Sequence, residues 1–164
     1  MKKFTIQVVF LIIVIGASLF FFSPTGKTPN FDLPFLPQKS TFSKLEINGI
    51  ILKVEIADTA SKRNKGLGGR DLLGQDQGML FIFPKLDKYA FWMKGLKFPL
   101  DFVWIKDNII VDLLENIPPP SAGAKDESLP IYSSRVEFDK VLEVNAGTIQ
   151  RLRIKAGDML KLSP

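Results

Sequence analysis

Residues 78–105 constrain the fold of this chain more than any other segment. They contain three short apolar runs, at positions 79–83, 89–93 and 102–105, and prolines, glycines and charged residues separate the runs. Apolar runs of about five residues bounded by turns are typical of buried strands, because a globular helix needs about ten residues or more. We therefore expect three core strands in this segment.

The chain beyond residue 41 continues this pattern of short strands. Asn48-Gly49 suits the two positive-φ positions of a type I′ hairpin turn, and positions 50–56 alternate as a half-buried strand does. A short helix is expected next, with Thr59 as its N-cap and Gly66 beyond its end. Further elements are expected as strands at 109–114, 141–144 and 159–162, a helical turn at 148–153 and a long proline-containing loop at 116–130. The predicted fold class is mostly β, a compact antiparallel β-sandwich or barrel with one or two short helices.

The N-terminal segment is organised differently. Residues 4–22 are nineteen positions without a charge, and as a helix they would rise about 28 Å, close to the hydrocarbon thickness of a bilayer. A cleaved signal peptide is the alternative, with Gly16 and Ser18 before the cut, but the apolar run continues past that point. We favour an uncleaved transmembrane helix at 1–22, a proline-rich linker at 23–41 and a β-rich domain at 42–164.

The charges around this hydrophobic segment predict its orientation. Lys2 and Lys3 precede it, whereas only Lys27 follows it closely. The positive-inside bias then places the N-terminus in the cytoplasm and the C-terminal domain outside the membrane. The predicted localisation is that of a single-pass protein of the cell membrane, and the membrane is its first expected partner.

The composition removes several kinds of chemistry. The chain has no Cys and no His, which excludes disulfides, thiolate nucleophiles, His-based acid–base catalysis and ordinary zinc sites. No acidic spacing typical of a calcium loop is present, so we expect neither a metal nor a cofactor. The first 40 residues hold four lysines and one aspartate and carry most of the net charge of +5. The remaining domain is too weakly basic to predict nucleic-acid binding.

Four residues form the candidate ligand-binding site: Arg70, Trp92, Lys94 and Asp101. Lys94 and Asp101 stand at the two ends of a short connection, and Arg70 follows a run of glycines. Two cations, a carboxylate and an aromatic ring on one partly apolar surface would suit a small polar or anionic ligand. The alternative is that Trp92 belongs to the core and that Asp101 pairs with Lys94 across the turn; we favour a structural role for Asp101. Trp104 adds a second aromatic face only if it points to the same side.

Catalysis without His or Cys would require paired carboxylates or a Ser–Lys arrangement. Asp58, Asp101, Asp112 and Glu115 could provide a pair at the separation of about 5–9 Å that glycosidases use, but nothing in the sequence brings two of them together. Neither a Gly-x-Ser-x-Gly nor a Ser-x-x-Lys motif is present. The sequence therefore does not support an enzyme.

Motifs spread over residues 45–162 make the chain resemble a known family. They are VEIADT at 54–59, Arg63, Gly66-Leu67, Arg70, GMLFIFP at 78–84, FWMK at 91–94, PLD at 99–101, VLEV at 141–144, Ala146-Gly147 and Gly157-Asp158. In these motifs the chain resembles the uncharacterised family named domain of unknown function 192. The resemblance implies a mostly antiparallel β fold of the sandwich or jelly-roll kind, commonly exported behind an N-terminal hydrophobic segment. It implies no activity.

The chain departs from that family's pattern at two places. Gly68-Gly69 stand where relatives carry a pair of large residues, and Gly95-Leu96 stand where they carry Asn-Thr. If those amide and hydroxyl groups belong to a site, the site of this protein is altered.

Together these observations favour a membrane-tethered, extracytoplasmic β-domain that acts as a binding or envelope-accessory module, with a small ligand or an envelope protein as partner. The alternative is a carboxylate-dependent hydrolase acting on envelope carbohydrate, which predicts a cleft containing at least two acids. A third hypothesis is a structural subunit of a membrane complex, which predicts an exposed apolar patch of several hundred Å².

Overall fold

The structure of this protein is a computed structural model that describes residues 42–163. The described chain contains seven strands, two short α-helices and one 3₁₀ turn. The strands are β1 (Phe42–Ile47), β2 (Ile50–Ala57), β3 (Gln77–Asp87), β4 (Leu100–Lys106), β5 (Ile109–Ile117), β6 (Phe138–Asn145) and β7 (Leu160–Ser163). The helices are α2 (Ala60–Lys65) and α3 (Thr148–Leu152), and the 3₁₀ turn is η1 (Asp126–Ser128).

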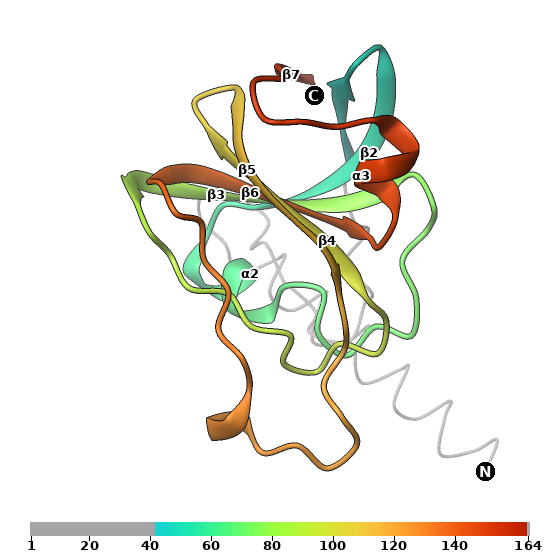
Figure 1. Ribbon diagram of the computed structural model, residues 1–164, viewed down its shortest axis with the longest axis vertical. Coiled ribbons are helices and arrows are strands. Elements are labelled where there is room, and N and C mark those ends of the chain that lie inside the picture. Colours follow the sequence, from blue (N-terminus) through green and yellow to red (C-terminus); the bar gives the residue numbers. More distant parts are fainter. Residues whose placement is uncertain (1–41, 164) are drawn as a thin grey trace, which may run out of the picture. The chain divides into compact units, whose positions relative to one another are not determined.

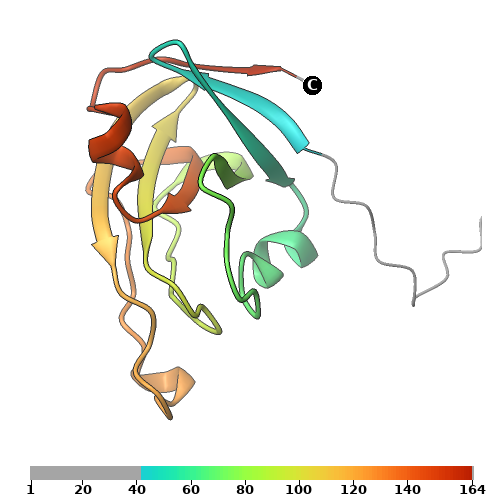
Figure 2. The same ribbon diagram turned by 90° about the vertical axis from the view of Figure 1, so that its right-hand side faces the viewer.

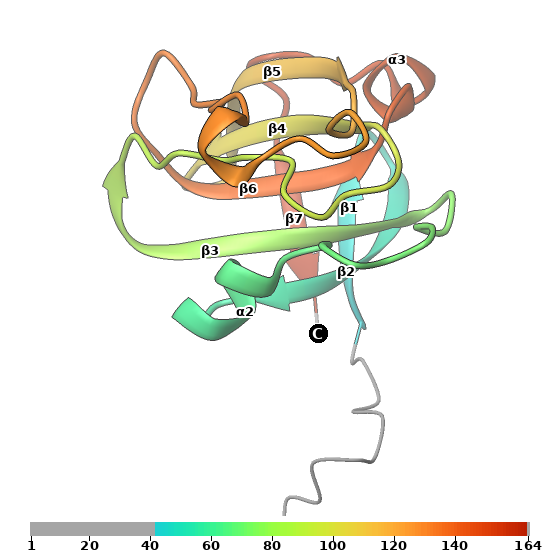
Figure 3. The same cartoon turned by 90° about the horizontal axis from the view of Figure 1, so that it is seen from below.

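All seven strands belong to one curled sheet in the order β5-β4-β6-β3-β2-β1-β7 (Figure 1). Seen from below, β5, β4, β6, β3 and β2 follow one another, while β1 and β7 cross behind them (Figure 3). The β1–β2 hairpin and β7 form one end of the curl (Figure 2). The expectation of a mostly β fold with two short helices is confirmed. A single sheet curled into a half-barrel takes the place of two packed sheets.

One strand pairing differs from the expected antiparallel arrangement, because β2 and β3 run parallel, with Val54 opposite Gly78. Parallel neighbours cannot be joined by a tight turn and need a crossover of about a dozen residues or more. Residues 58–76 provide this crossover, in which α2 and the glycine-containing loop after it lead from the end of β2 to the start of β3. The crossover brings α2 beside β2 and β3, where it borders the site (Figure 3).

Local turn chemistry is as the sequence predicts. Asn48 (φ 52°) and Gly49 (φ 77°) take the positive φ values of a type I′ turn between β1 and β2. The hydroxyl of Thr59 accepts a hydrogen bond of 3.2 Å from the N–H of Lys62, and Gly66 ends α2. These local signals are confirmed because each depends on a conformation that its own side chain favours.

The expectation of a strand at 89–93 is wrong. Within that part of the described chain Phe91 alone forms a bridge, to Tyr132, through two backbone hydrogen bonds of 2.8 Å. β3 instead continues through Pro84 to Asp87, and its pairing with β6 is interrupted there, where a proline costs no ladder hydrogen bond. The segment after β3 therefore crosses the face of the sheet instead of joining it (Figure 3).

The sheet buries apolar side chains on both faces. One face carries an aliphatic cluster, in which Leu80, Leu142 and Val144 pack with residues of α3. The other face carries an aromatic cluster that includes Phe81, Phe91, Phe102, Trp104 and Phe138. Because alternate residues of a strand point to opposite faces, both sets of alternate residues are buried in β3, β4 and β6.

The long connection between β5 and β6 packs against the aromatic face. It starts after Ile117, where β5 ends. It is held by the Phe91–Tyr132 bridge and by Asp112, whose carboxylate accepts hydrogen bonds of 3.0 Å from the Ser134 hydroxyl and the Arg135 N–H. The connection is therefore tied to the sheet at two places before β6 begins.

The predicted transmembrane helix at 1–22 and the predicted linker at 23–41 lie outside the described residues. Within residues 42–163 no helix is long and apolar enough to cross a bilayer. The membrane topology therefore stays a prediction.

Candidate ligand-binding pocket

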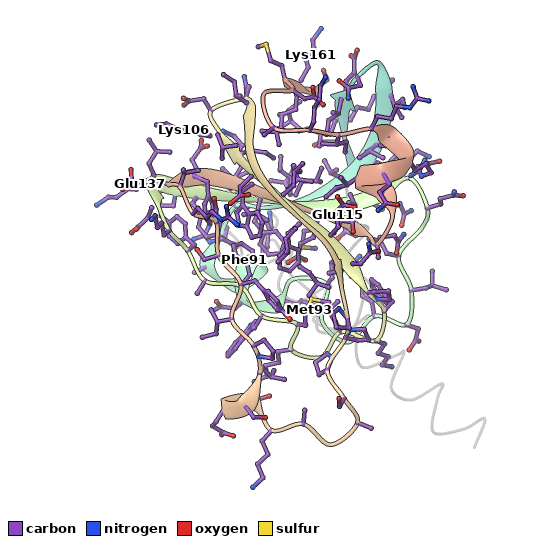
Figure 4. The ribbon with its side chains drawn as sticks, in the orientation of Figure 1. Phe91, Met93, Lys106, Glu115, Glu137 and Lys161 are labelled. Carbon is purple, nitrogen blue, oxygen red and sulfur yellow. The ribbon has the colours of Figure 1, made fainter. Side chains whose placement is uncertain are left out.

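A pocket of about 520 Å³ opens on the aromatic face, between α2 with its following loop and the segment after β3. Its lining comes from residues 63–69, from 89–96 apart from Met93, from Phe81 and Phe83 of β3, and from Glu143 of β6. In Figure 4, Phe91 lies near the middle of the molecule and Met93 below it, whereas Lys161 lies at the top. The parallel crossover and the segment after β3 thus form the two sides of one pocket.

Glu143 is the unusual member of this lining. It lies in β6 opposite Met79 of β3 and Phe102 of β4, and only 5% of its surface is exposed. Val141, two residues earlier, belongs to the aromatic cluster, so strand alternation directs Glu143 to the same face. No hydrogen bond within residues 42–163 reaches its carboxyl, and burial alone raises its pKa to about 8. Near neutral pH the pocket therefore holds a mostly protonated carboxyl group without a partner in the described chain.

Aromatic rings pack against one another along the wall of the pocket. The rings of Phe83 and Tyr89 are stacked with their centres 3.8 Å apart. Phe91 meets Phe81 edge-on at 5.4 Å and Phe83 edge-on at 6.0 Å. Rings held in such contacts stabilise one another beyond the area that they bury. The wall is therefore preformed.

The rim of the pocket forms where two loops meet through their backbones. The N–H of Gly69 donates to the carbonyl of Gly95 at 2.8 Å. A Cβ at Gly68 would lie 3.2 Å from the carbonyl oxygens of both Lys65 and Lys94. Gly69 (φ 78°) and Gly95 (φ 69°) also have backbone conformations that favour glycine. Gly68-Gly69 and Gly95-Leu96, the two places at which the chain departs from the family pattern, therefore contact each other.

Two of the three cationic side chains that line the pocket, Arg63 and Lys94, are engaged with other parts of the protein. Arg63 donates hydrogen bonds of 2.8 Å to the carbonyls of Asp58 and Ile82, and its guanidinium lies 5.2 Å from the centre of the Phe83 ring. Arg63 thereby ties the start of α2 to β3. Lys94 forms an ion pair with Asp126 of η1.

The structure separates the four residues that the sequence predicts as one site. Trp92 and Lys94 line the pocket together, with the Lys94 ammonium 5.4 Å from the centre of the half-exposed Trp92 ring. Arg70 does not line it. The Arg70 guanidinium instead forms a bidentate ion pair with Glu55 of β2, through hydrogen bonds of 2.5 and 2.9 Å. These hydrogen bonds lower the pKa of Glu55.

Asp101 also lies away from the pocket. It is fully buried in β4, and its two carboxylate oxygens accept hydrogen bonds of 2.9 Å from the N–H groups of Asn116 and Ile149. The ion pair with Lys94 that the sequence offered as an alternative does not form, because Lys94 pairs with Asp126. Asp101 therefore has a structural role.

Trp104 points to the aromatic face but is buried against Phe102 and Phe138, with ring centres 5.9 and 6.4 Å away. It does not line the pocket. The second aromatic face is supplied instead by the rings after β3. The alternation of side chains along a strand shows which face Trp104 points to, but it does not distinguish a ring buried on that face from one that borders a pocket.

The acids considered for hydrolysis do not meet in this pocket, where Glu143 is the only acid among the lining residues. Asp58 pairs with Lys62 at 2.8 Å on the surface, and Asp112 holds the connection before β6. Within residues 42–163, no group of three acidic side chains is placed to hold a metal ion. The cleft with two acids that the hydrolase alternative requires is not supported.

Sequence reasoning did not single out Glu143. Its neighbours Leu142 and Val144 are buried on the aliphatic face, a pattern that predicts a solvent-facing residue between them. Here β6 lies between β3 and β4 in the middle of the sheet, and both of its faces are covered. A single acid inside the VLEV run of a central strand was the signal that could have found it.

The sequence and fold of this chain are shared by other proteins. Residues 43–162 match the family model of DUF192, described as "Uncharacterized ACR". A solved structure from Sinorhizobium meliloti, whose name proposes a transcription regulator, is 34% identical with a TM-score of 0.66, covering 75% of this chain and 95% of that one. A protein of unknown function from Novosphingobium aromaticivorans is 27% identical with a TM-score of 0.65, covering 73% of this chain and 84% of that one. Among curated proteins, none matches.

Proposed function

Because this chain belongs to DUF192, a family described only as uncharacterised, we propose from its own pocket that the domain is a binding module for a small ligand. The observation that carries the proposal is the Glu143 carboxyl, which is buried at the pocket and has no partner in the described chain. A buried polar group without a partner costs folding free energy. Such a group is retained most readily where a ligand completes its interactions.

The pocket also has the general character of a ligand site. It is concave, and its lining combines aromatic rings with a buried acid and three cationic side chains. Its shape is fixed by the Gly69–Gly95 contact on one side and by stacked rings on the other. A preformed pocket of this kind favours binding because little conformational freedom is lost when a ligand enters.

The prediction of an anionic ligand required Arg70 and Lys94 to face the pocket as unpaired cations. Each of these cations is paired with a carboxylate, Glu55 and Asp126 respectively, and Arg70 does not line the pocket. Glu143 is the buried charged side chain of the lining, and no hydrogen bond within residues 42–163 reaches its carboxyl. We therefore base the proposed function on Glu143 and keep Trp92 and Lys94 as rim residues that a ligand would contact.

The role named for the Sinorhizobium meliloti protein is not carried over to this chain. Two of the four basic residues in and after α2 are paired with acids, Lys62 with Asp58 and Arg70 with Glu55, which leaves Arg63 and Lys65. A nucleic-acid interface would need several cations free to displace counterions along one surface. We keep a small-molecule ligand as the proposed partner.

The methionines of this chain provide a direct test. Met79 lies opposite Glu143 in the sheet and Met93 adjoins Trp92, whereas the exposed Met159 lies two residues before Lys161, at the far end of the molecule (Figure 4). Full-length protein in detergent micelles, labelled with ¹³C at the Met methyls, would be titrated with 2-phenylethylammonium, 2-phenylethanol and phenylacetate. Saturable shifts of the Met79 and Met93 signals without a shift of Met159 support the pocket. If none of the probes shifts them, the pocket is not a binding site.

We further propose that residues 4–22 tether this module to the membrane with the domain on the extracytoplasmic side. The proposal is supported by the uncharged run and by the lysines before it. Alkaline extraction of membranes and protease treatment of intact spheroplasts test it. A domain that stays with the membrane and is digested from outside is expected, whereas a soluble or protected domain would refute the topology.

A further inference from the structure

The pocket contains one buried group that determines what kind of ligand can complete it. We infer that it accepts a compact organic cation, a protonated amine on an apolar body, whose N–H groups bind the carboxylate of Glu143. The inference rests on the proposed function, because it names the ligand class of the same pocket. The positive charge distinguishes these ligands from alcohols and carboxylic acids with the same apolar body, which would fit the same pocket.

Glu143 lies between Met79 and Phe102 in the sheet, and neither neighbour offers a donor. A carboxylate buried among apolar side chains is stabilised by an opposite charge in direct contact, and an ammonium supplies both that charge and up to three N–H donors. A bound anion would instead require Glu143 to stay protonated and to donate its O–H. The geometry therefore favours a cation.

Phe81, Phe83, Tyr89 and Phe91 line the same pocket as Glu143, and their rings are fixed by mutual contacts. A cation gains free energy over the face of an aromatic ring, and the gain is larger when water is excluded. The apolar body of the amine would pack against the remaining ring surface.

The charged or titratable side chains lining the pocket besides Glu143 are Arg63 and Lys65 from α2, and Tyr89 and Lys94 from the segment after β3. None of them contributes to the pKa shift of Glu143, which burial alone sets. Lys94 is paired with Asp126, Arg63 donates to two backbone carbonyls, and Lys65 is exposed to solvent. Their remaining effect is that of partly solvated charges, which salt screens.

Binding of this kind moves one proton. In the empty pocket Glu143 is mostly protonated at neutral pH, and the ammonium binds its carboxylate, so the Glu143 proton passes to the buffer while the amine keeps its own. Apparent affinity should therefore rise by up to tenfold per pH unit below the pKa of about 8 and become constant above it. Phenylacetate, which would accept a hydrogen bond from the protonated carboxyl, should show the opposite dependence.

The test is calorimetric titration of the full-length protein in micelles with 2-phenylethylammonium, 2-phenylethanol and phenylacetate, at pH about 6.5 and about 8.5 and in two buffers of different ionisation enthalpy. The matched variants are Glu143→Gln, which keeps the shape of the side chain, and Glu115→Gln, which changes an exposed acid on β5. We expect the ammonium to bind at least tenfold more tightly than either other probe at the higher pH, with proton release at the lower pH. Glu143→Gln should remove this preference and Glu115→Gln should retain it.

Three results would overturn the inference. Phenylacetate or 2-phenylethanol binding as tightly as the ammonium at both pH values would leave the pocket a binding site but exclude a cation as its ligand class. An ammonium preference that survives Glu143→Gln would assign recognition to another group. Failure of all three probes to bind would refute the proposed function together with the inference.

Discussion

The Asp101 carboxylate accepts a hydrogen bond of 2.9 Å from the N–H of Ile149, 48 residues further along the chain. Its other oxygen accepts one from Asn116, so a single buried side chain joins β4, β5 and α3. Glu143, on the neighbouring strand β6, is also buried, with 5% of its surface exposed, but has no such partner in the described chain. Burial alone therefore does not distinguish a structural acid from one at a candidate site, whereas the hydrogen-bond partners do.

Asp101→Asn should destabilise the domain by about 1–3 kcal/mol, because the amide places an NH₂ group against a backbone N–H and leaves that donor unpaired. Urea unfolding followed by tryptophan fluorescence would measure the loss. Asp71→Asn, which removes only an exposed ion pair with Lys97, is the matched control and should leave the unfolding midpoint unchanged. Equal effects of the two variants would show that the buried hydrogen bonds of Asp101 contribute nothing.

Glu143→Gln should stabilise the domain relative to the natural protein, by an amount that grows as the pH rises from about 4.5 to about 8. The pKa of Glu143 is about 8 in the folded protein against an ordinary 4.5, so the folded state binds more protons between these pH values. The stability of the natural protein therefore falls through that window, by up to about 1.4 kcal/mol per pH unit from this group, while the Gln variant does not titrate. Denaturation at a series of pH values would measure the difference. Parallel profiles for the two proteins would contradict an elevated pKa.

Arg70→Ala should lower stability by about 1 kcal/mol, through loss of the partly buried pair with Glu55. Because Arg70 lowers the pKa of Glu55, this contribution is present at neutral pH and is lost as acid protonates Glu55. Thermal unfolding at pH about 7 and about 3 would show the difference between protein and variant shrinking at the lower pH. If Arg70→Ala lost ligand binding but kept its stability, Arg70 would have a role in binding and not in stability.

Gly68→Ala should weaken binding of 2-phenylethylammonium, because the added Cβ would press on the carbonyls of Lys65 and Lys94 and part the two loops of the rim. Gly49→Ala is the control for stability, since it introduces positive-φ strain of about 1 kcal/mol in a remote hairpin with open space around it. The Met-methyl titration would compare them. An equal loss of affinity in both variants would mean that rim geometry has no special role.

Much of the fold follows from local chemistry in the sequence. The Asn48-Gly49 turn and the Thr59 cap are predictable because each residue favours its conformation without help from distant parts of the chain. The parallel pairing of β2 with β3 is not predictable in this way, since α2 and its loop pass over the sheet and the pairing depends on where the chain returns. The strand expected at 89–93 failed for a similar reason. Its apolar residues are buried by packing across the sheet, with Trp92 left half exposed.

The candidate site was predictable only in part. Trp92 and Lys94 are adjacent on one short segment, so their common place at the pocket needed no long-range information. Arg70 and Asp101 are drawn away by partners 15 and 48 residues distant, Glu55 and Ile149, which no local pattern indicates. Glu143 was overlooked because strand alternation predicts exposure for it, and only the covering of both faces of β6 buries it.

The most direct measurement is the titration of the Glu143 side-chain ¹³Cδ signal by NMR, in full-length protein with and without 2-phenylethylammonium, with assignment by its absence in Glu143→Gln. Without the ammonium, Glu143 should titrate with a midpoint at pH about 8. When the ammonium saturates the pocket, the midpoint should fall by at least about one pH unit. A midpoint near the ordinary glutamate value in the free protein, or one that the ammonium leaves unchanged, would contradict it.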